Sequence, residues 1–137
     1  MSRKTKGQQW RRPSACSMFY VKKHLEVSAS HQVKMPGGKC EAPHGHNWFI
    51  TVYCKSEKLD EHGMVVDFCQ IKSEIMSRLD HKNLNEVLNF NPTAENIAHW
   101  IAHLIPYCYR VDVQESRNNE AIYEKSECEK FEKSEGR

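Results

Sequence analysis

Two long runs of alternating apolar and polar residues constrain the fold of this chain most. The first run carries apolar side chains between Phe19 and Ala29 and closes at His31. The second begins at His46 and continues through Trp48, Ile50, Val52 and Cys54. Side chains of a β-strand point alternately to its two faces, so a period of two indicates a strand with one buried face. We therefore expect two strands, with His44 and His46 on the same face of the second strand or just before it.

The segment from Cys40 to His46 places two imidazoles and a thiol close together between these runs. A neighbouring strand could bring His31 alongside His44 and His46, and three nitrogen donors leave one coordination position open. A structural zinc ion is usually bound by four protein ligands, whereas a catalytic zinc ion keeps one coordination position for water or substrate. A chance pair on a surface strand would explain His44 and His46 alone, but the addition of His31 and Cys40 favours a metal site.

The role of Cys40 stays open between two alternatives. If its sulfur binds the metal, the site is a closed structural one. If the sulfur stands apart, it is a free thiol beside a cation, and both the cation and the neighbouring Lys39 would lower its pKa towards neutrality. The thiolate could then act as a base or a nucleophile.

A first helix is predicted after the two strands. Asp67 can act as its N-cap, and Gln70, three residues later, can reach back as in a capping box. The apolar residues that follow with helical spacing are Phe68, Ile71, Ile75 and Leu79. We interpret Asp67 as a capping residue rather than a catalytic one.

A carboxylate and an imidazole stand next to each other after this helix, at Asp80 and His81. A carboxylate that orients an imidazole produces a general acid or base with a pKa near 7. Adjacent side chains do not automatically touch, however. An exposed pair at a helix end is an equally good interpretation.

A second helix is predicted from Thr93, its N-cap, to a stop at Pro106. Its apolar stripe consists of Ile97, Trp100, Ile101 and Leu104. The next period-two series contains Tyr109, Val111 and Val113 and ends at Glu115, a carboxylate on an apolar face. Burying that carboxylate is unfavourable without a partner. The partner could be a salt bridge or a guanidine-like ligand edge with two parallel donors.

The order of these elements, with a short last strand around residues 121–123, predicts an α+β fold. Strands that are not regularly interleaved with helices favour an antiparallel sheet with helices on one face. The length of 137 residues fits a single domain. We assign it to residues 18–124, flanked by a basic tail at 1–17 and a polar tail at 125–137.

Composition narrows the classes of function. A hydrophobic content of 39% and a charged content of 28% are ordinary for a soluble globular protein, and no apolar run reaches the roughly 20 residues of a membrane span. A net charge of +2 argues against nucleic-acid binding as the main activity. The spacing of the cysteines does not suggest a disulfide framework, so Cys54, Cys69 and Cys108 are interpreted as small core residues, and a reducing cytoplasm is the expected location.

The chain resembles the family of 6-pyruvoyltetrahydropterin and 6-carboxytetrahydropterin synthases over roughly residues 19–123. The order and spacing of several short motifs carry this resemblance. They are Ser28-Ala29-Ser30-His31, Gly38-Lys39-Cys40, His44-Gly45-His46-Asn47, Gly63-Met64-Val65-Val66-Asp67-Phe68, Leu79-Asp80-His81-Lys82-Asn83-Leu84, Pro92-Thr93-Ala94-Glu95-Asn96, and Glu115 with Tyr123.

The resemblance implies a tunnelling fold, in which a four-stranded antiparallel sheet carries two helices on one face. Three subunits would form a barrel, and two trimers would stack into a homohexamer with active sites between subunits. Zinc would bind His31, His44 and His46. The family also implies Cys40, Asp80 and His81 as proton-transfer groups. Glu115 would hold the pterin ring, with Thr93 and Glu95 beside it. Lys39 would contact the triphosphate, although a solvated lysine is equally plausible.

The implied function is that of a zinc-dependent lyase, a 6-carboxy-5,6,7,8-tetrahydropterin synthase. It would convert 7,8-dihydroneopterin triphosphate to 6-carboxytetrahydropterin, acetaldehyde and triphosphate on the pathway towards queuosine. The three residues between Cys40 and His44 favour this carboxy branch. The segments 80–84 and 115–119 are more similar to the alternative, a 6-pyruvoyltetrahydropterin synthase. A non-catalytic, zinc-stabilised pterin-binding protein is a second alternative.

Overall fold

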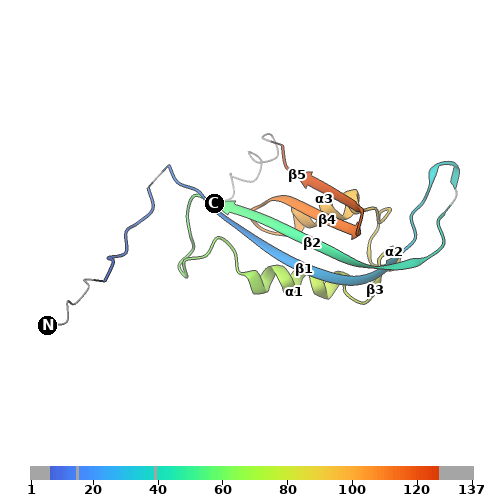
Figure 1. Cartoon of the computed structure of the whole chain (residues 1–137), viewed down its shortest axis with the longest axis horizontal. Helices are drawn as coiled ribbons and strands as arrows, with labels where there is room; N and C mark the ends of the chain where they lie inside the picture. Colours follow the sequence, from blue (N-terminus) through green and yellow to red (C-terminus); the bar gives the residue numbers. More distant parts are fainter. Residues whose placement is uncertain (1–6, 15, 39, 127–137) are drawn as a thin grey trace.

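The computed structural model describes residues 7–14, 16–38 and 40–126, which form one β-sheet covered by helices (Figure 1). The elements, in chain order, are β1 (Phe19–His31), the short 3-10 turn η1 (Pro36–Gly38), β2 (His44–Ser56), α1 (Phe68–Leu79), β3 (Lys82–Asn83), α2 (Leu84–Val87), α3 (Ala94–Leu104), β4 (Cys108–Ser116) and β5 (Asn119–Glu124). Within the described part of the chain, no helix is both long enough and apolar enough to span a bilayer.

Strands β1 and β2 form the long hairpin that the alternating runs predict. They pair antiparallel without a break from Phe19 opposite Ser56 to His31 opposite His44. Every second side chain is buried from Leu25 to His31 in β1 and from Trp48 to Cys54 in β2. This alternation gives the sheet one face that packs into the core.

The sheet has five strands in the order β3-β1-β2-β4-β5. The expected four-stranded antiparallel sheet is therefore wrong in one respect, because β3 adds a fifth strand that runs parallel to β1 and makes the sheet mixed. Strand β3 spans only two residues, too few to show a period in the sequence. A hydrogen bond that His81 N–H donates to the Ser28 carbonyl, at 2.7 Å, holds the chain against β1 at this point.

Helix α1 begins as predicted after Asp67, whose Oδ1 accepts a hydrogen bond from Cys69 N–H at 2.8 Å. Its buried stripe holds Ile71, Ile75 and Leu79. Phe68 does not belong to this stripe, contrary to expectation, because it is 45% exposed. Cys69 is also exposed and is not a core residue, whereas Cys54 and Cys108 are buried as predicted. Both exceptions lie in the first turn of the helix.

Helix α3 also follows the prediction. Thr93 Oγ1 accepts a hydrogen bond from Asn96 N–H at 3.1 Å, and the helix ends at Leu104, with Ile105 as its C-cap directly before Pro106. The expectation of only two helices is wrong, because the single turn α2 lies between them. Asn83 caps this turn by accepting from Asn85 N–H. Four residues are too few to reveal a helical period in the sequence.

The core lies between the sheet and the two longer helices. Helix α1 packs on β1, and α3 packs on β4 and β5. The buried strand residues share the face on which these helices pack, and they include Trp48, Val52, Val111 and Val113. His31, His44 and His46 lie on this same face, at the end of the hairpin.

Candidate metal centre

Three histidines converge where the hairpin of β1 and β2 leaves the core. His31 is the last residue of β1 and stands directly opposite His44, the first residue of β2, while His46 stands opposite Ala29. The ring centroids of the three histidines lie 4.6 to 5.0 Å apart. The sequence prediction that a neighbouring strand brings His31 beside the other two is therefore confirmed.

Hydrogen bonds to backbone carbonyls fix the tautomers of two of these rings. Nδ1 of His31 lies 2.8 Å from the Pro92 carbonyl, and Nδ1 of His44 lies 2.8 Å from the Ala42 carbonyl. A carbonyl oxygen only accepts, so in both rings Nδ1 carries the proton and donates it. Each Nε2 of a neutral ring is then left with a lone pair, and the two Nε2 atoms face each other at 3.0 Å. Such a contact is repulsive unless a proton or a cation lies between the nitrogens.

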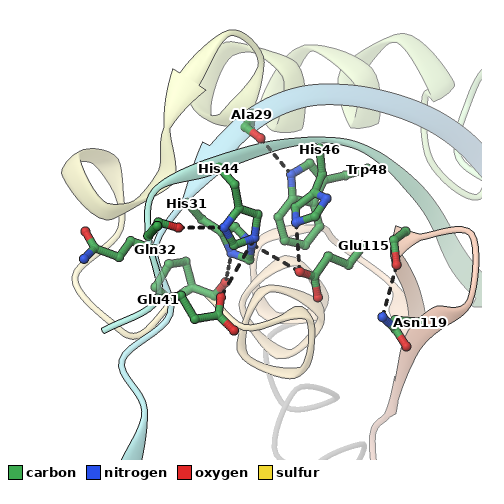
Figure 2. A network of polar contacts seen from close by, with 12 residues as sticks. Ala29, His31, Gln32, Glu41, His44, His46, Trp48, Glu115 and Asn119 are labelled. Atoms are coloured by element: carbon green, nitrogen blue, oxygen red, sulfur yellow. Dashed lines mark hydrogen bonds and ion pairs between the residues drawn. The ribbon is translucent and has the colours of Figure 1, made fainter. Parts of the chain in front are cut away.

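Glu115, on β4, brings a negative charge to the same point. Its Oε1 lies 3.0 Å from His46 Nε2 and 3.2 Å from His31 Nε2 (Figure 2). His46 Nε2 is buried, and no described group is aligned with it for a hydrogen bond, so the carboxylate contact is close but poorly directed. Burial lowers the pKa of His46, and Glu115 opposes that shift only in part. The Nε2 atom of His46 is therefore a third imidazole nitrogen of the cluster without an aligned hydrogen-bond partner.

The four donor atoms of His31, His44, His46 and Glu115 all lie within 4.8 Å of one another. Zinc binds imidazole nitrogen at 2.0 to 2.1 Å and carboxylate oxygen at similar distances in a tetrahedral arrangement, which places neighbouring ligand atoms about 3.3 Å apart. Three of the pairwise distances here are 3.0, 3.0 and 3.2 Å. The residues present thus fit a small divalent cation, and the carbonyls behind His31 and His44 are typical outer partners of metal-binding imidazoles.

Trp48 supports the centre from the core side. Its ring packs edge-on against His31 and His46, with centroids 4.8 and 5.4 Å away. Its Nε1–H donates to the Ala29 carbonyl at 3.2 Å, which fixes the indole (Figure 2). Because His31 is only 1% exposed, at least one side of the centre is closed to water.

Cys40 lies apart from the histidines within the chain. It is exposed in the connection between β1 and β2, where it forms an isolated bridge with Lys34. It lines a cavity of about 310 Å³ whose other walls include Gln32 and Asn91. Its sulfur is not among the donor atoms of the metal cluster. Lys39, which was expected to contact triphosphate, lies outside the described residues.

Asp80 and His81 form a contact pair at the edge of the sheet. Asp80 Oδ1 accepts from Ser28 N–H at 3.0 Å, while its Oδ2 lies 3.5 Å from His81 Nε2. The His81 backbone has a φ of 56°, and its side chain is 82% exposed. His81 and His46 line the same cavity of about 510 Å³. His81 thus borders a space that also reaches one histidine of the cluster.

Thr93 and Glu95 lie at the start of α3. Thr93 is the N-cap of this helix, and Glu95 is exposed in its first turn. Thr93 directly follows Pro92, the carbonyl partner of His31, so the beginning of α3 adjoins the metal centre.

Reasoning from the sequence missed two kinds of contributor to the centre. The first is the pair of backbone carbonyls, of Pro92 and Ala42, which leave no sequence signal. The second is the position of the Glu115 carboxylate against two imidazoles. Its unusual place on an apolar face did signal a buried partner, but the spacing of residues could not identify which one.

Comparison with known proteins points to one family. Residues 20–126 match the family described as 6-pyruvoyl tetrahydropterin synthase. A 6-carboxy-5,6,7,8-tetrahydropterin synthase of Synechocystis sp. is 36% identical over 120 residues, which cover 77% of this chain and 93% of that protein. The 6-pyruvoyl tetrahydrobiopterin synthase of Homo sapiens is 33% identical over 129 residues, covering 75% and 89%. The structure of Caenorhabditis elegans 6-pyruvoyl tetrahydropterin synthase aligns with a TM-score of 0.64 at 25% identity, over 86% of this chain and 100% of that one.

Proposed function

Because the chain belongs to the 6-pyruvoyl tetrahydropterin synthase family, we propose that it is a zinc-dependent lyase acting on 7,8-dihydroneopterin triphosphate. The product we propose is 6-carboxytetrahydropterin, released with acetaldehyde and triphosphate for the pathway towards queuosine. The observation that carries the zinc-dependent part is the convergence of imidazole nitrogens whose tautomers are fixed by the carbonyls of Pro92 and Ala42.

The metal ligands in this proposal are His31, His44 and His46. Bound zinc would supply Lewis acidity that lowers the pKa of a substrate hydroxyl and stabilises developing negative charge on oxygen. The chain itself orients the site: two carbonyls hold two of the rings, and Trp48 packs against His31 and His46 from the core side.

Glu115 has two compatible tasks in this proposal. Its Oε1 contacts two of the proposed ligand histidines. When a pterin binds, the carboxylate would accept two parallel N–H donors from the guanidine-like edge of the ring, a geometry that strengthens charge-assisted hydrogen bonds. Thr93 and Glu95, at the nearby start of α3, would line the same ring site.

Proton transfer is assigned to Cys40, Asp80 and His81. Cys40, as a thiolate, would remove a proton from a side-chain carbon of the substrate, and His81, oriented by Asp80, would deliver one to the ring. His81 is exposed and lines the cavity that reaches His46. Cys40 is also exposed but lies apart from its own chain's histidines.

The separation of Cys40 from the histidines supports an assembly of several subunits. We propose a homohexamer, a dimer of trimers, with active sites between subunits, in which an exposed thiol of one copy can approach the metal centre of another. We also propose a cytoplasmic location and, for Lys39, a contact with the triphosphate.

Three observations bear on the branch of the family. The short spacing between Cys40 and His44 and the 36% identity to a carboxy enzyme favour the carboxy product. The 33% identity to a human pyruvoyl enzyme keeps 6-pyruvoyltetrahydropterin synthase as the alternative. A non-catalytic, zinc-stabilised pterin-binding protein is the second alternative.

Incubation of the zinc-loaded chain with dihydroneopterin triphosphate, followed by mass analysis of the products, tests the proposal. We expect a carboxypterin together with acetaldehyde. A pterin that retains its three-carbon side chain would assign the chain to the pyruvoyl branch. Unchanged substrate, bound but not converted, would support the non-catalytic alternative. The matched control is His62→Ala, which removes an exposed imidazole far from the cluster in sequence and should leave the product unchanged.

A further inference from the structure

Two cysteines face each other at the end of the sheet remote from the histidines. Cys54 on β2 and Cys108 on β4 are directly opposed register partners, and both point into the core, with exposed fractions of 0% and 3%. A register shift between Tyr53 and Cys54 produces this pairing: Tyr53 pairs with Arg110, so an unbroken ladder would place Tyr109 opposite Cys54. The irregularity replaces that tyrosine with a second thiol.

The opposition of the two residues suits a covalent link. Opposed residues on antiparallel strands have Cβ atoms about 4.5 to 5.5 Å apart. A disulfide needs Cα atoms within roughly 4.4 to 6.8 Å and Cβ atoms near 4 Å, so only a small local adjustment is required. Neither thiol has a role in the proposed lyase chemistry.

The environment makes the two thiols unequal. The Cys108 sulfur accepts a hydrogen bond from the Cys54 S–H, which raises the pKa of Cys54 and lowers that of Cys108. The Cys108 S–H in turn donates to the Arg110 carbonyl at 3.4 Å. The positive charge of Lys125, which is only 5% exposed, favours the thiolate further. Its backbone N–H donates to the Tyr109 carbonyl at 2.9 Å, next to Cys108 in sequence. Cys108 is therefore the better nucleophile and Cys54 the resolving thiol.

We propose that Cys54 and Cys108 form a reversible dithiol–disulfide couple that is oxidised by hydroperoxides. The Cys108 thiolate attacks the peroxide oxygen, the O–O bond breaks, and Cys108 becomes a sulfenic acid while hydroxide, or the alkoxide of an organic peroxide, leaves. Cys54 then loses its proton, its sulfur attacks the Cys108 sulfur, and the sulfenic oxygen leaves as water. The two sulfurs supply the two electrons that reduce the peroxide. A thiol reductant then returns the disulfide to two thiols by exchange and is itself oxidised to a disulfide.

The couple is separate from the metal centre. Cys54 lies eight residues along β2 from His46, a distance of roughly 27 Å in an extended strand. Oxidation would tie β2 to β4, which are adjacent strands in the middle of the sheet. We therefore expect oxidation to raise the thermal unfolding midpoint without changing zinc content.

The test uses the full zinc-loaded chain. The reduced protein is treated with a few equivalents of hydrogen peroxide, unfolded in N-ethylmaleimide to block the remaining thiols, digested without reductant and analysed by mass spectrometry. We expect a peptide pair joined through Cys54 and Cys108 that disappears after dithiothreitol treatment. Recovery of both residues as maleimide adducts, while exposed Cys16, Cys40 or Cys69 is oxidised, would overturn the proposal.

Two variants sharpen the result. Cys69→Ser removes an exposed thiol outside the couple, so the linked peptide should form in equal yield. Cys54→Ala removes the resolving thiol, so Cys108 should accumulate as a sulfenic acid that dimedone traps. If Cys54→Ala does not fold, the linked peptide from the unaltered chain still decides the question.

Discussion

Zinc should stabilise the fold through His46 by an amount that can be estimated from the site. The Nε2 atoms of His31 and His44 face each other at 3.0 Å, and that of His46 is buried without an aligned hydrogen-bond partner. A cation bound only by the folded state stabilises it by about 4 kcal/mol when its concentration is 1,000 times its dissociation constant. The strands and helices span residues 19–124, so the unfolding entropy is roughly 0.22 kcal/mol/K and the unfolding midpoint should rise by roughly 18 °C.

His46→Ala should remove most of this effect. Loss of a direct nitrogen ligand is expected to weaken zinc binding at least about 100-fold, since changes to mere outer partners already cost 10- to 100-fold. At the same zinc concentration only about 1.4 kcal/mol of stabilisation then remains, which corresponds to a rise of roughly 6 °C. Scanning calorimetry of metal-free and zinc-loaded samples, with metal content measured in parallel, provides the comparison.

The control for this experiment is His62→Ala, because the His62 side chain is 72% exposed and lies in the connection between β2 and α1. It should respond to zinc like the unaltered chain. The reasoning would be refuted if zinc left the midpoint of the unaltered chain unchanged, or if His46→Ala and His62→Ala responded equally.

Four further predictions follow from the site and the helix caps. Cys40→Ala should lower turnover by 10²- to 10⁴-fold, as expected for loss of a general base, with unchanged zinc content; undiminished turnover would remove the thiol from the mechanism. Glu115→Gln should keep zinc bound when zinc is in excess. It should raise the KM for the pterin triphosphate by about 10- to 100-fold, because a hydrogen bond to a charged group contributes roughly that factor to binding. An unaltered KM in steady-state assays would argue against the pterin contact. Burial lowers the pKa of His46 below its ordinary value of 6.5, so protons compete with zinc at this ring only below pH 6.5. Zinc retention, measured by equilibrium dialysis, should therefore fall as the pH decreases from 6.5 to 5. Zinc loss that is already complete at pH 7 would contradict this prediction. Asp67→Ala should destabilise the fold by about 1 kcal/mol through loss of the α1 cap, whereas Asp67→Asn should keep the cap and the stability. Neither variant should alter turnover. Reduced turnover in Asp67→Asn would show that Asp67 does more than cap the helix.

The hairpin and its histidines could be predicted because their signal is local and periodic. Alternation fixed which side chains share a face, and an antiparallel pairing was enough to bring His31 opposite His44. The N-caps at Asp67 and Thr93 were equally local, since each depends on a side chain and a backbone N–H a few residues away.

The features that escaped prediction depend on short segments or on distant register. Strand β3 and helix α2 contain too few residues to show any period. Phe68 lies in the first turn of α1, where helical spacing alone does not show whether a side chain still reaches the core. Glu115 follows the period of β4, but its contacts with His31 and His46 depend on the pairing of strands far apart in sequence, which no residue pattern in β4 reveals.

The hairpin separates the candidate metal ligands from the Cys40 thiol in a way that bears on how such proteins diversify. The ligand histidines are held by paired strand ends, whereas Cys40 belongs to the protruding arm between them (Figure 1). As long as Ala42 keeps its carbonyl on His44, this arm can be lengthened, shortened or exchanged without moving a single ligand. Under the proposed function, a change in this arm would alter the thiol that meets the substrate while the candidate ligand histidines stay in place.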